Sequence, residues 1–137
     1  MPSSLSHSFS AQYQILATSI LKRTQDEWSL SDLPLAAQVS PVFGIVSHDF
    51  NKDGLQDIFL TGNLFSVKPE VGRIDANSGI LLKGMGKLIF EPVHPSLTGV
   101  VISGEVRDME IFYDASGEAT VLVAKNNDLV QWIKGNK

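Results

Sequence analysis

Cysteine is absent from the 137 residues of this chain, which excludes a disulfide framework, a thiolate metal site and a cysteine nucleophile. Long apolar runs are also absent, because no stretch approaches the roughly 20 residues that a membrane-spanning helix needs. We therefore expect no membrane insertion. Basic residues are few: 11 Lys and Arg stand against 15 Asp and Glu, for a net charge of −4. Nucleic-acid binding needs clustered positive charge, so we expect no nucleic-acid partner.

Recognisable catalytic motifs are missing as well. The chain has no Gly-x-Ser-x-Gly elbow. Its three histidines, His7, His48 and His94, are too scattered for a zinc site. The start, Met1-Pro2-Ser3-Ser4, lacks the basic and apolar regions of a signal peptide. We expect a chain that is not an enzyme, and an exported parent protein would have to supply its export signal from elsewhere.

The composition itself is that of a globular protein, with 43% hydrophobic and 19% charged residues. Short apolar runs rich in β-branched and aromatic residues alternate with Gly, Asn, Asp and Pro, which predicts strands and turns and an all-β fold. Only the stretch from Phe9 to Leu21 favours a helix, and there we expect at most a short N-terminal helical turn. The expected strands are 15–22, 27–31, 42–48, 57–61, 79–83, 87–92, 108–113, 119–124 and 129–133.

A weak internal repeat organises these strands. A shift of 63 residues places Gly54 on Gly117 and Asn63 on Asn126. A period near 60 with four strands per unit is typical of antiparallel β-propeller blades, although chance similarity between apolar segments explains it equally well. The repeat divides the chain into residues 1–35, the second half of a preceding blade, 36–98, a complete blade, and 99–137, a degenerate following blade. About two four-stranded blades make only a partial propeller, so we expect the isolated chain to self-associate.

The strongest chemical signal is the segment Asp49-Phe50-Asn51-Lys52-Asp53-Gly54-Leu55-Gln56-Asp57. Calcium takes six to eight oxygen ligands in a flexible shell. Side-chain oxygens of Asp49, Asn51 and Asp53 can converge on one ion, Gly54 permits a sharp turn, and the Leu55 carbonyl can point inward. Asp57 closes the shell directly or through water. We therefore expect one Ca²⁺ ion, bound by Asp49, Asn51, Asp53, Leu55 and Asp57.

Two other interpretations of this loop were weighed. An EF-hand needs a bidentate ligand at loop position 12, where this chain has Leu60, and it needs helical flanks where this sequence predicts strands. A plain hairpin turn that binds nothing is the second alternative. The repeat supplies an internal control, because Phe112, Asp114, Ser116 and Thr120 replace Asp49, Asn51, Asp53 and Asp57, so one carboxylate remains at these positions where the first loop has three. We expect the turn 114–118 to bind no ion.

The motif Asp-x-Asn-x-Asp-Gly-x-x-Asp, preceded by Val42-Phe43-Gly44, resembles the FG-GAP or VCBS repeat. Residues 27–137 also resemble the C-terminal part of bacterial proteins of the ASPIC/UnbV-associated type. The resemblance implies a β-propeller and an extracellular or cell-surface parent. It also implies a role in cell adhesion or carbohydrate binding, with a glycan or a surface protein as partner. Asn51 departs from the Asp often found at loop position 3, which removes a charge and puts the calcium affinity in doubt.

The leading functional expectation is thus a calcium-stabilised, non-catalytic interaction module. The alternatives are a propeller segment of a polysaccharide-processing enzyme and a purely structural segment that closes a larger propeller. Four aromatic residues, Trp28, Phe65, Tyr113 and Trp132, have rings that suit sugar stacking, but we expect them to pack between sheets.

Overall fold

The computed structural model describes residue 12, residues 14–70 and residues 72–135, and in this part the chain is almost entirely β. Nine strands and two four-residue helices follow one another in the order β1 (Ser19–Arg23), β2 (Trp28–Asp32), η1 (Leu35–Gln38), β3 (Gly44–His48), β4 (Asp57–Thr61), β5 (Ile80–Gly84), β6 (Phe90–Pro92), α1 (Pro95–Thr98), β7 (Val106–Tyr113), β8 (Ala119–Lys125) and β9 (Gln131–Lys134). No helix in the described ranges has the length and apolar character needed to span a membrane.

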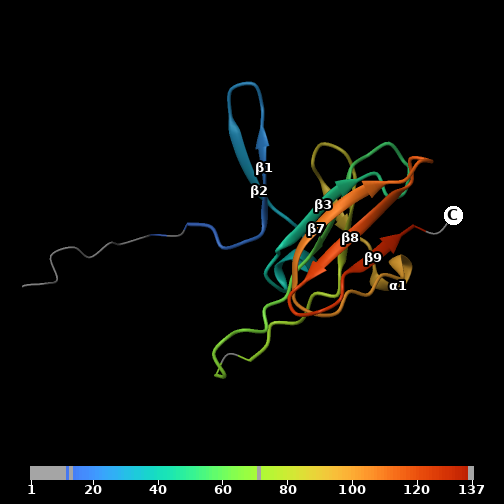
Figure 1. The fold of residues 1–137 in the computed structure, drawn as a ribbon. Helices are drawn as coiled ribbons and strands as arrows, with labels where there is room; N and C mark the ends of the chain where they lie inside the picture. Colours follow the sequence, from blue (N-terminus) through green and yellow to red (C-terminus); the bar gives the residue numbers. More distant parts are fainter. Residues whose placement is uncertain (1–11, 13, 71, 136–137) are drawn as a thin grey trace, which may run out of the picture.

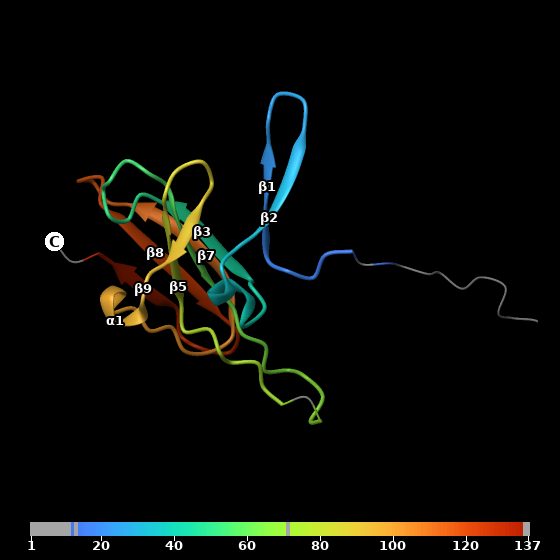
Figure 2. The ribbon, with the colours of Figure 1, turned by 180° about the vertical axis from the view of Figure 1, so that it is seen from behind.

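The strands form three antiparallel sheets, each a simple meander. β1 and β2 pair as a hairpin, the second sheet has the order β3-β4-β5-β6, and the third has the order β7-β8-β9. Figure 1 shows the hairpin standing away from the two larger sheets, which lie face to face. Figure 2 shows the same arrangement from behind, with the second sheet in front of the third.

The second sheet is covered on both faces, which explains why every residue of β4 is buried. One face packs against the third sheet, in a core that contains Val46, Phe59, Ile102, Val106, Met109, Val121 and Val123. The other face packs against the segment that follows the hairpin, in a core that contains Leu33, Ala37, Ile58, Leu60 and Leu82. Side chains alternate along a strand, so adjacent residues such as Ile58 and Phe59 serve opposite cores.

The all-β prediction is confirmed at the level of the sheets, and each of the nine expected strands overlaps a strand of the structure. The expected helical turn near Phe9 falls mainly outside the described residues, and residues 14–18 form no helix. The helices η1 and α1 were not expected. The three sheets lie within residues 1–35, 36–98 and 99–137 respectively. The described residues form no closed barrel or propeller, and the assignment of these sheets to blades stays a prediction.

Candidate metal centre

The oxygen-rich loop joins β3 to β4 at one end of the second sheet. His48 and Asp57 are register partners, so the residues between them form the loop of an antiparallel hairpin. Two residues of this loop have left-handed backbones, Lys52 with φ 61° and Gly54 with φ 85°. Glycine adopts this conformation without steric cost, so Gly54 provides the sharp turn that the sequence predicts.

The loop is folded around its own side-chain oxygens. Asp49 accepts a hydrogen bond from the Asp53 backbone N–H at Oδ1 (3.0 Å) and one from the Gly54 N–H at Oδ2 (2.8 Å). Asn51 Oδ1 also accepts from the Asp53 N–H, at 2.9 Å, and Asp53 Oδ1 accepts from the Leu55 N–H, at 3.0 Å. Each of these oxygens has a second lone pair. The hydrogen bonds therefore fix the oxygens in place and leave each with the capacity to bind a cation.

Asp57 has a different environment from the other loop carboxylates. It is only 1% exposed. Its Oδ1 accepts from the Gly84 N–H of β5 at 2.8 Å, and its Oδ2 accepts from the Phe50 N–H at 3.1 Å. Among the described residues, no Lys, Arg or His nitrogen lies within 4.0 Å of this carboxylate. Asp57 thus anchors the loop to β5, and both of its oxygens are bonded to neutral backbone N–H groups.

Strand β5 also makes two further contacts with the loop, one through Gly84 and one through Lys83. A Cβ added to Gly84 would lie 2.2 Å from the Gln56 carbonyl oxygen, so only glycine allows this close approach. The neighbouring Lys83 places its Nζ 3.1 Å from Asp53 Oδ2, with the two side chains 43% and 30% exposed. The Leu55 N–H and the Lys83 ammonium both hold the pKa of Asp53 below its usual range.

The five predicted ligands all lie in this hairpin, but with different degrees of exposure. Asn51, Asp53 and Leu55 are exposed, Asp49 is half-buried and Asp57 is buried. In the described part of the chain, no three Asp, Glu, His or Cys side chains form a ready-made metal-binding group. A metal site here therefore needs the Asn51 oxygen and a backbone carbonyl in addition to the carboxylates. In their chemistry these donors fit calcium, which accepts carboxylate, amide and carbonyl oxygens.

The second hairpin, between β7 and β8, has a smaller polar turn. Asp114 Oδ1 accepts from the backbone N–H groups of Ser116 (2.9 Å) and Glu118 (3.0 Å). Its Oδ2 lies 2.8 Å from Lys134 Nζ of β9, and this ammonium and the Ser116 hydroxyl hold the pKa of Asp114 far below its usual range. The two hairpin tips lie side by side (Figures 1 and 2), joined by an ion pair of 3.2 Å between Lys52 and Glu118.

A buried carboxylate that the sequence analysis missed, Glu105, lies at the start of the third sheet and is 3% exposed. It accepts the Phe65 N–H (2.9 Å) and the Asn126 side-chain amide (2.7 Å), and it pairs with Arg107 at 2.9 Å. These hydrogen bonds and the Arg107 charge lower its pKa. Because Glu105 connects the second and third sheets, its role here is structural. No local motif marks it, since two of its three partners, Phe65 and Asn126, come from distant segments.

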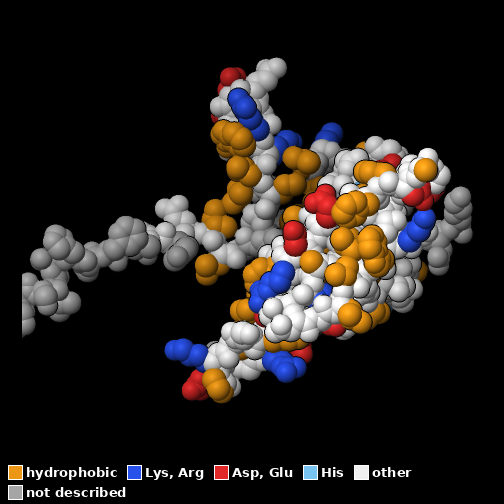
Figure 3. All heavy atoms as spheres, viewed as in Figure 1, with side chains coloured by type: hydrophobic (Ala, Val, Ile, Leu, Met, Phe, Trp, Pro, Cys, Tyr) orange, Lys and Arg blue, Asp and Glu red, His pale blue; other side chains and the backbone are white. Residues whose placement is uncertain are grey.

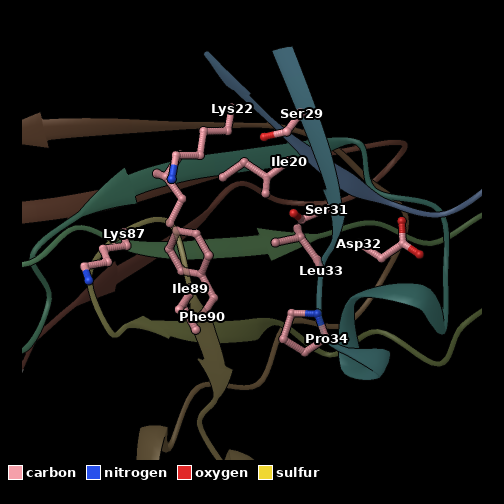
Figure 4. A pocket seen from close by; sticks show the side chains of 11 residues that line it. Ile20, Lys22, Ser29, Ser31, Asp32, Leu33, Pro34, Lys87, Ile89 and Phe90 are labelled. Atoms are coloured by element: carbon pink, nitrogen blue, oxygen red, sulfur yellow. The ribbon is translucent and has the colours of Figure 1, made fainter. Parts of the chain in front are cut away.

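Two surface hollows lie elsewhere. One, of about 400 Å³, lies between the β1–β2 hairpin and residues 87–90, and its charged side chains are Lys22, Lys87 and Asp32 (Figure 4). The other, of about 770 Å³, lies between the two large sheets beside α1 and β9, and its lining is an even mixture of polar and apolar surface. None of the five predicted metal ligands lines either hollow.

The aromatic side chains differ from expectation. Trp28, Tyr113 and Trp132 are 63%, 61% and 64% exposed, so the prediction that they pack between sheets is wrong for Trp28 and Trp132. Tyr113 nevertheless contacts the second sheet at its edge, because its ring centroid lies 5.7 Å from that of His48 of β3. Trp28 contacts the Arg23 guanidinium, whose carbon lies 5.5 Å from the ring centroid, and Phe65 contacts Arg73 in the same way at 5.0 Å.

The fold and the loop define a class in general terms: a chain of stacked antiparallel sheets with one oxygen-rich hairpin loop clamped by a neighbouring strand. No family model, curated protein or solved structure matches this chain. Functional inference therefore rests on the geometry of the chain itself.

Proposed function

We propose that this chain is a non-catalytic interaction module whose loop 49–57 binds one calcium ion. The observation that supports the proposal most directly is the arrangement of the loop. Three oxygen-bearing side chains, Asp49, Asn51 and Asp53, are held by backbone N–H groups, and no basic nitrogen of the described residues lies within 4.0 Å of the buried Asp57 carboxylate. A divalent cation would offset this concentration of negative charge.

Calcium suits the loop better than magnesium or zinc. Magnesium demands a near-ideal octahedron, whereas calcium tolerates the irregular shell that a mixed set of carboxylate, amide and carbonyl oxygens provides. Zinc prefers histidine and cysteine, and none of the five predicted ligands is of either type. When bound, the ion would supply positive charge that joins the loop side chains, while Asp57 keeps the loop attached to β5.

The proposal also covers the parent protein and its partner. We infer that the stacked sheets are blades of a larger β-propeller in an exported or cell-surface protein, with a glycan or a surface protein as partner. The four-stranded meander and its face-to-face packing with a second meander support the propeller interpretation. The exposed rings of Trp28, Tyr113 and Trp132 are available to a partner and are of the type that stacks on sugars.

Thermal unfolding of the full chain tests the calcium proposal. Extracellular modules bind calcium with dissociation constants of about 10⁻⁴ to 10⁻³ M. At 100 times that constant, binding adds about 2.7 kcal/mol to the free energy of unfolding, which for a domain of this size raises the melting temperature by about 10 °C. The Asp53→Ala variant should lose this shift, and the matched Asp114→Ala variant should keep it. Equal melting temperatures of the wild-type chain in EDTA and in calcium would refute the proposal.

A further inference from the structure

One side chain next to the loop has a role that the calcium proposal does not include. Lys83, on β5, extends its ammonium to Asp53 and lies 3.1 Å from Oδ2. The opposite oxygen of the same carboxylate, Oδ1, is bonded to the Leu55 N–H. The loop therefore already binds a cationic group, and it does so at a carboxylate that the calcium site would use.

We propose that Lys83 is a built-in competitor of calcium, whose ammonium neutralises the loop until the metal displaces it. This inference rests on the proposed calcium site and adds the residue that sets its affinity. The ammonium carries one charge and three N–H donors, whereas calcium carries two charges and takes six to eight oxygens. The two cations repel each other, so an ammonium at Asp53 opposes the binding of calcium to the same carboxylate.

The surroundings of Lys83 allow such an exchange. Its side chain is 43% exposed, and a lysine stem is flexible, so the ammonium can move into water at little cost. An exposed pair of this kind contributes little to stability, because solvent screens it. Asp57, in contrast, is held by two backbone N–H groups and stays in place. The Lys83–Asp53 ion pair is thus a more labile attachment of the loop than the buried bonds of Asp57, and the metal would replace it.

The second hairpin also has an ion pair between a lysine of a later strand and an aspartate of its loop, but it lacks the other proposed calcium ligands. Lys134, on the third strand of its sheet, pairs with Asp114 of the hairpin turn at 2.8 Å, just as Lys83 pairs with Asp53. In each sheet, a lysine of the strand after the hairpin thus contacts an acid of the hairpin loop. In the second turn, Asp114 is the one carboxylate at a position that corresponds to a loop ligand, and Lys134 pairs with it, whereas Glu118 pairs with Lys52 of the first loop. This makes Lys134 a matched control for Lys83.

Calorimetric titration of the full chain with calcium chloride tests the inference. Lys83→Met keeps most of the aliphatic stem but removes the charge, and it should raise calcium affinity about three- to fivefold. Lys83→Arg, which keeps the charge, should bind as the wild type does, and so should Lys134→Met. Circular dichroism in EDTA checks that each variant is folded.

The outcomes separate the two proposals. An absence of calcium binding by the wild-type chain overturns the calcium site and this inference with it. Calcium binding by the wild-type chain with equal or weaker affinity in Lys83→Met retains the calcium site and overturns the role of Lys83. An equal gain in affinity from Lys134→Met would also overturn it, because the effect would then come from net charge and not from competition at Asp53.

Discussion

At the scale of single residues, the structure distinguishes two kinds of loop carboxylate that look alike in the sequence. Asp49 and Asp53 hold the loop's own backbone and face its surface. Asp57 is buried and bonds across to Gly84, 27 residues further along the chain. The motif spacing predicted the oxygen-rich turn because that pattern is local. The anchoring role of Asp57 depends on which strand lies beside it, and spacing within the loop carries no information on that.

Glu105 provides a prediction of pH dependence at this scale. Its pKa in the folded chain lies below the ordinary value of 4.5, because the Phe65 N–H, the Asn126 amide and Arg107 favour the charged form. A carboxylate with a lowered folded pKa stabilises the fold above its unfolded pKa and loses that contribution as the pH falls through the folded pKa. The wild-type chain should therefore lose stability from about pH 5 downward.

Urea unfolding at several acidic pH values measures this effect. Glu105→Gln cannot titrate, so it should lose less stability than the wild type over the same pH range, while Glu110→Gln, on the exposed face of the same sheet, should follow the wild type. Parallel curves for Glu105→Gln and the wild type would show that Glu105 is not a source of the acid sensitivity.

At the scale of elements, the strands were predictable and the helices were not. Alternating apolar residues and turn chemistry are local signals, and they located all nine strands of the described chain. The helices η1 and α1 are single turns of four residues, too short for a helical period to appear. Signals for α1 are nevertheless present: Pro95 stands at its first turn and Gly99 ends it with φ 63°.

The close contact between β5 and loop 49–57 predicts the effect of a substitution at Gly84. In Gly84→Ala, the new Cβ would lie 2.2 Å from the Gln56 carbonyl oxygen, so either the strand or the loop must move. Overpacking of this kind costs about 1–3 kcal/mol, and the shift should also weaken calcium binding. Gly135→Ala is the control, because a Cβ there meets nothing within 4 Å. If urea unfolding gave equal stabilities for both variants, the clamp between β5 and the loop would be absent.

At the scale of the whole molecule, the three sheets differ in how much of their surface is buried by neighbouring parts of the chain. The second sheet is enclosed on both faces, but the hairpin β1–β2 has exposed residues throughout β2, including Trp28 at 63% and Leu30 at 42%. Figure 3 shows apolar side chains on this hairpin and on the face that carries β7 and β8. The face-to-face packing of the second and third sheets depends on contacts between residues far apart in the sequence. Local sequence patterns therefore located the strands of each sheet but not the way in which the sheets pack together.

This exposure predicts self-association of the isolated chain. Unpaired strand edges and apolar faces favour contact with another chain, so the mass measured by light scattering should rise with protein concentration. Trp28→Ser together with Leu30→Ser should shift the chain toward the monomer. A chain that stays monomeric at all concentrations, with a compact scattering profile, would contradict the interpretation of the stack as an incomplete propeller.

The central claim, that loop 49–57 holds one calcium ion, is tested most directly by the number of ions bound per chain. Equilibrium dialysis against calcium, with the wild-type chain, Asp53→Ala and Asp114→Ala side by side, gives that number without relying on stability. The account predicts one ion for the wild type, one for Asp114→Ala and none for Asp53→Ala. No ion bound to the wild type, two ions per chain, or full binding by Asp53→Ala would contradict it.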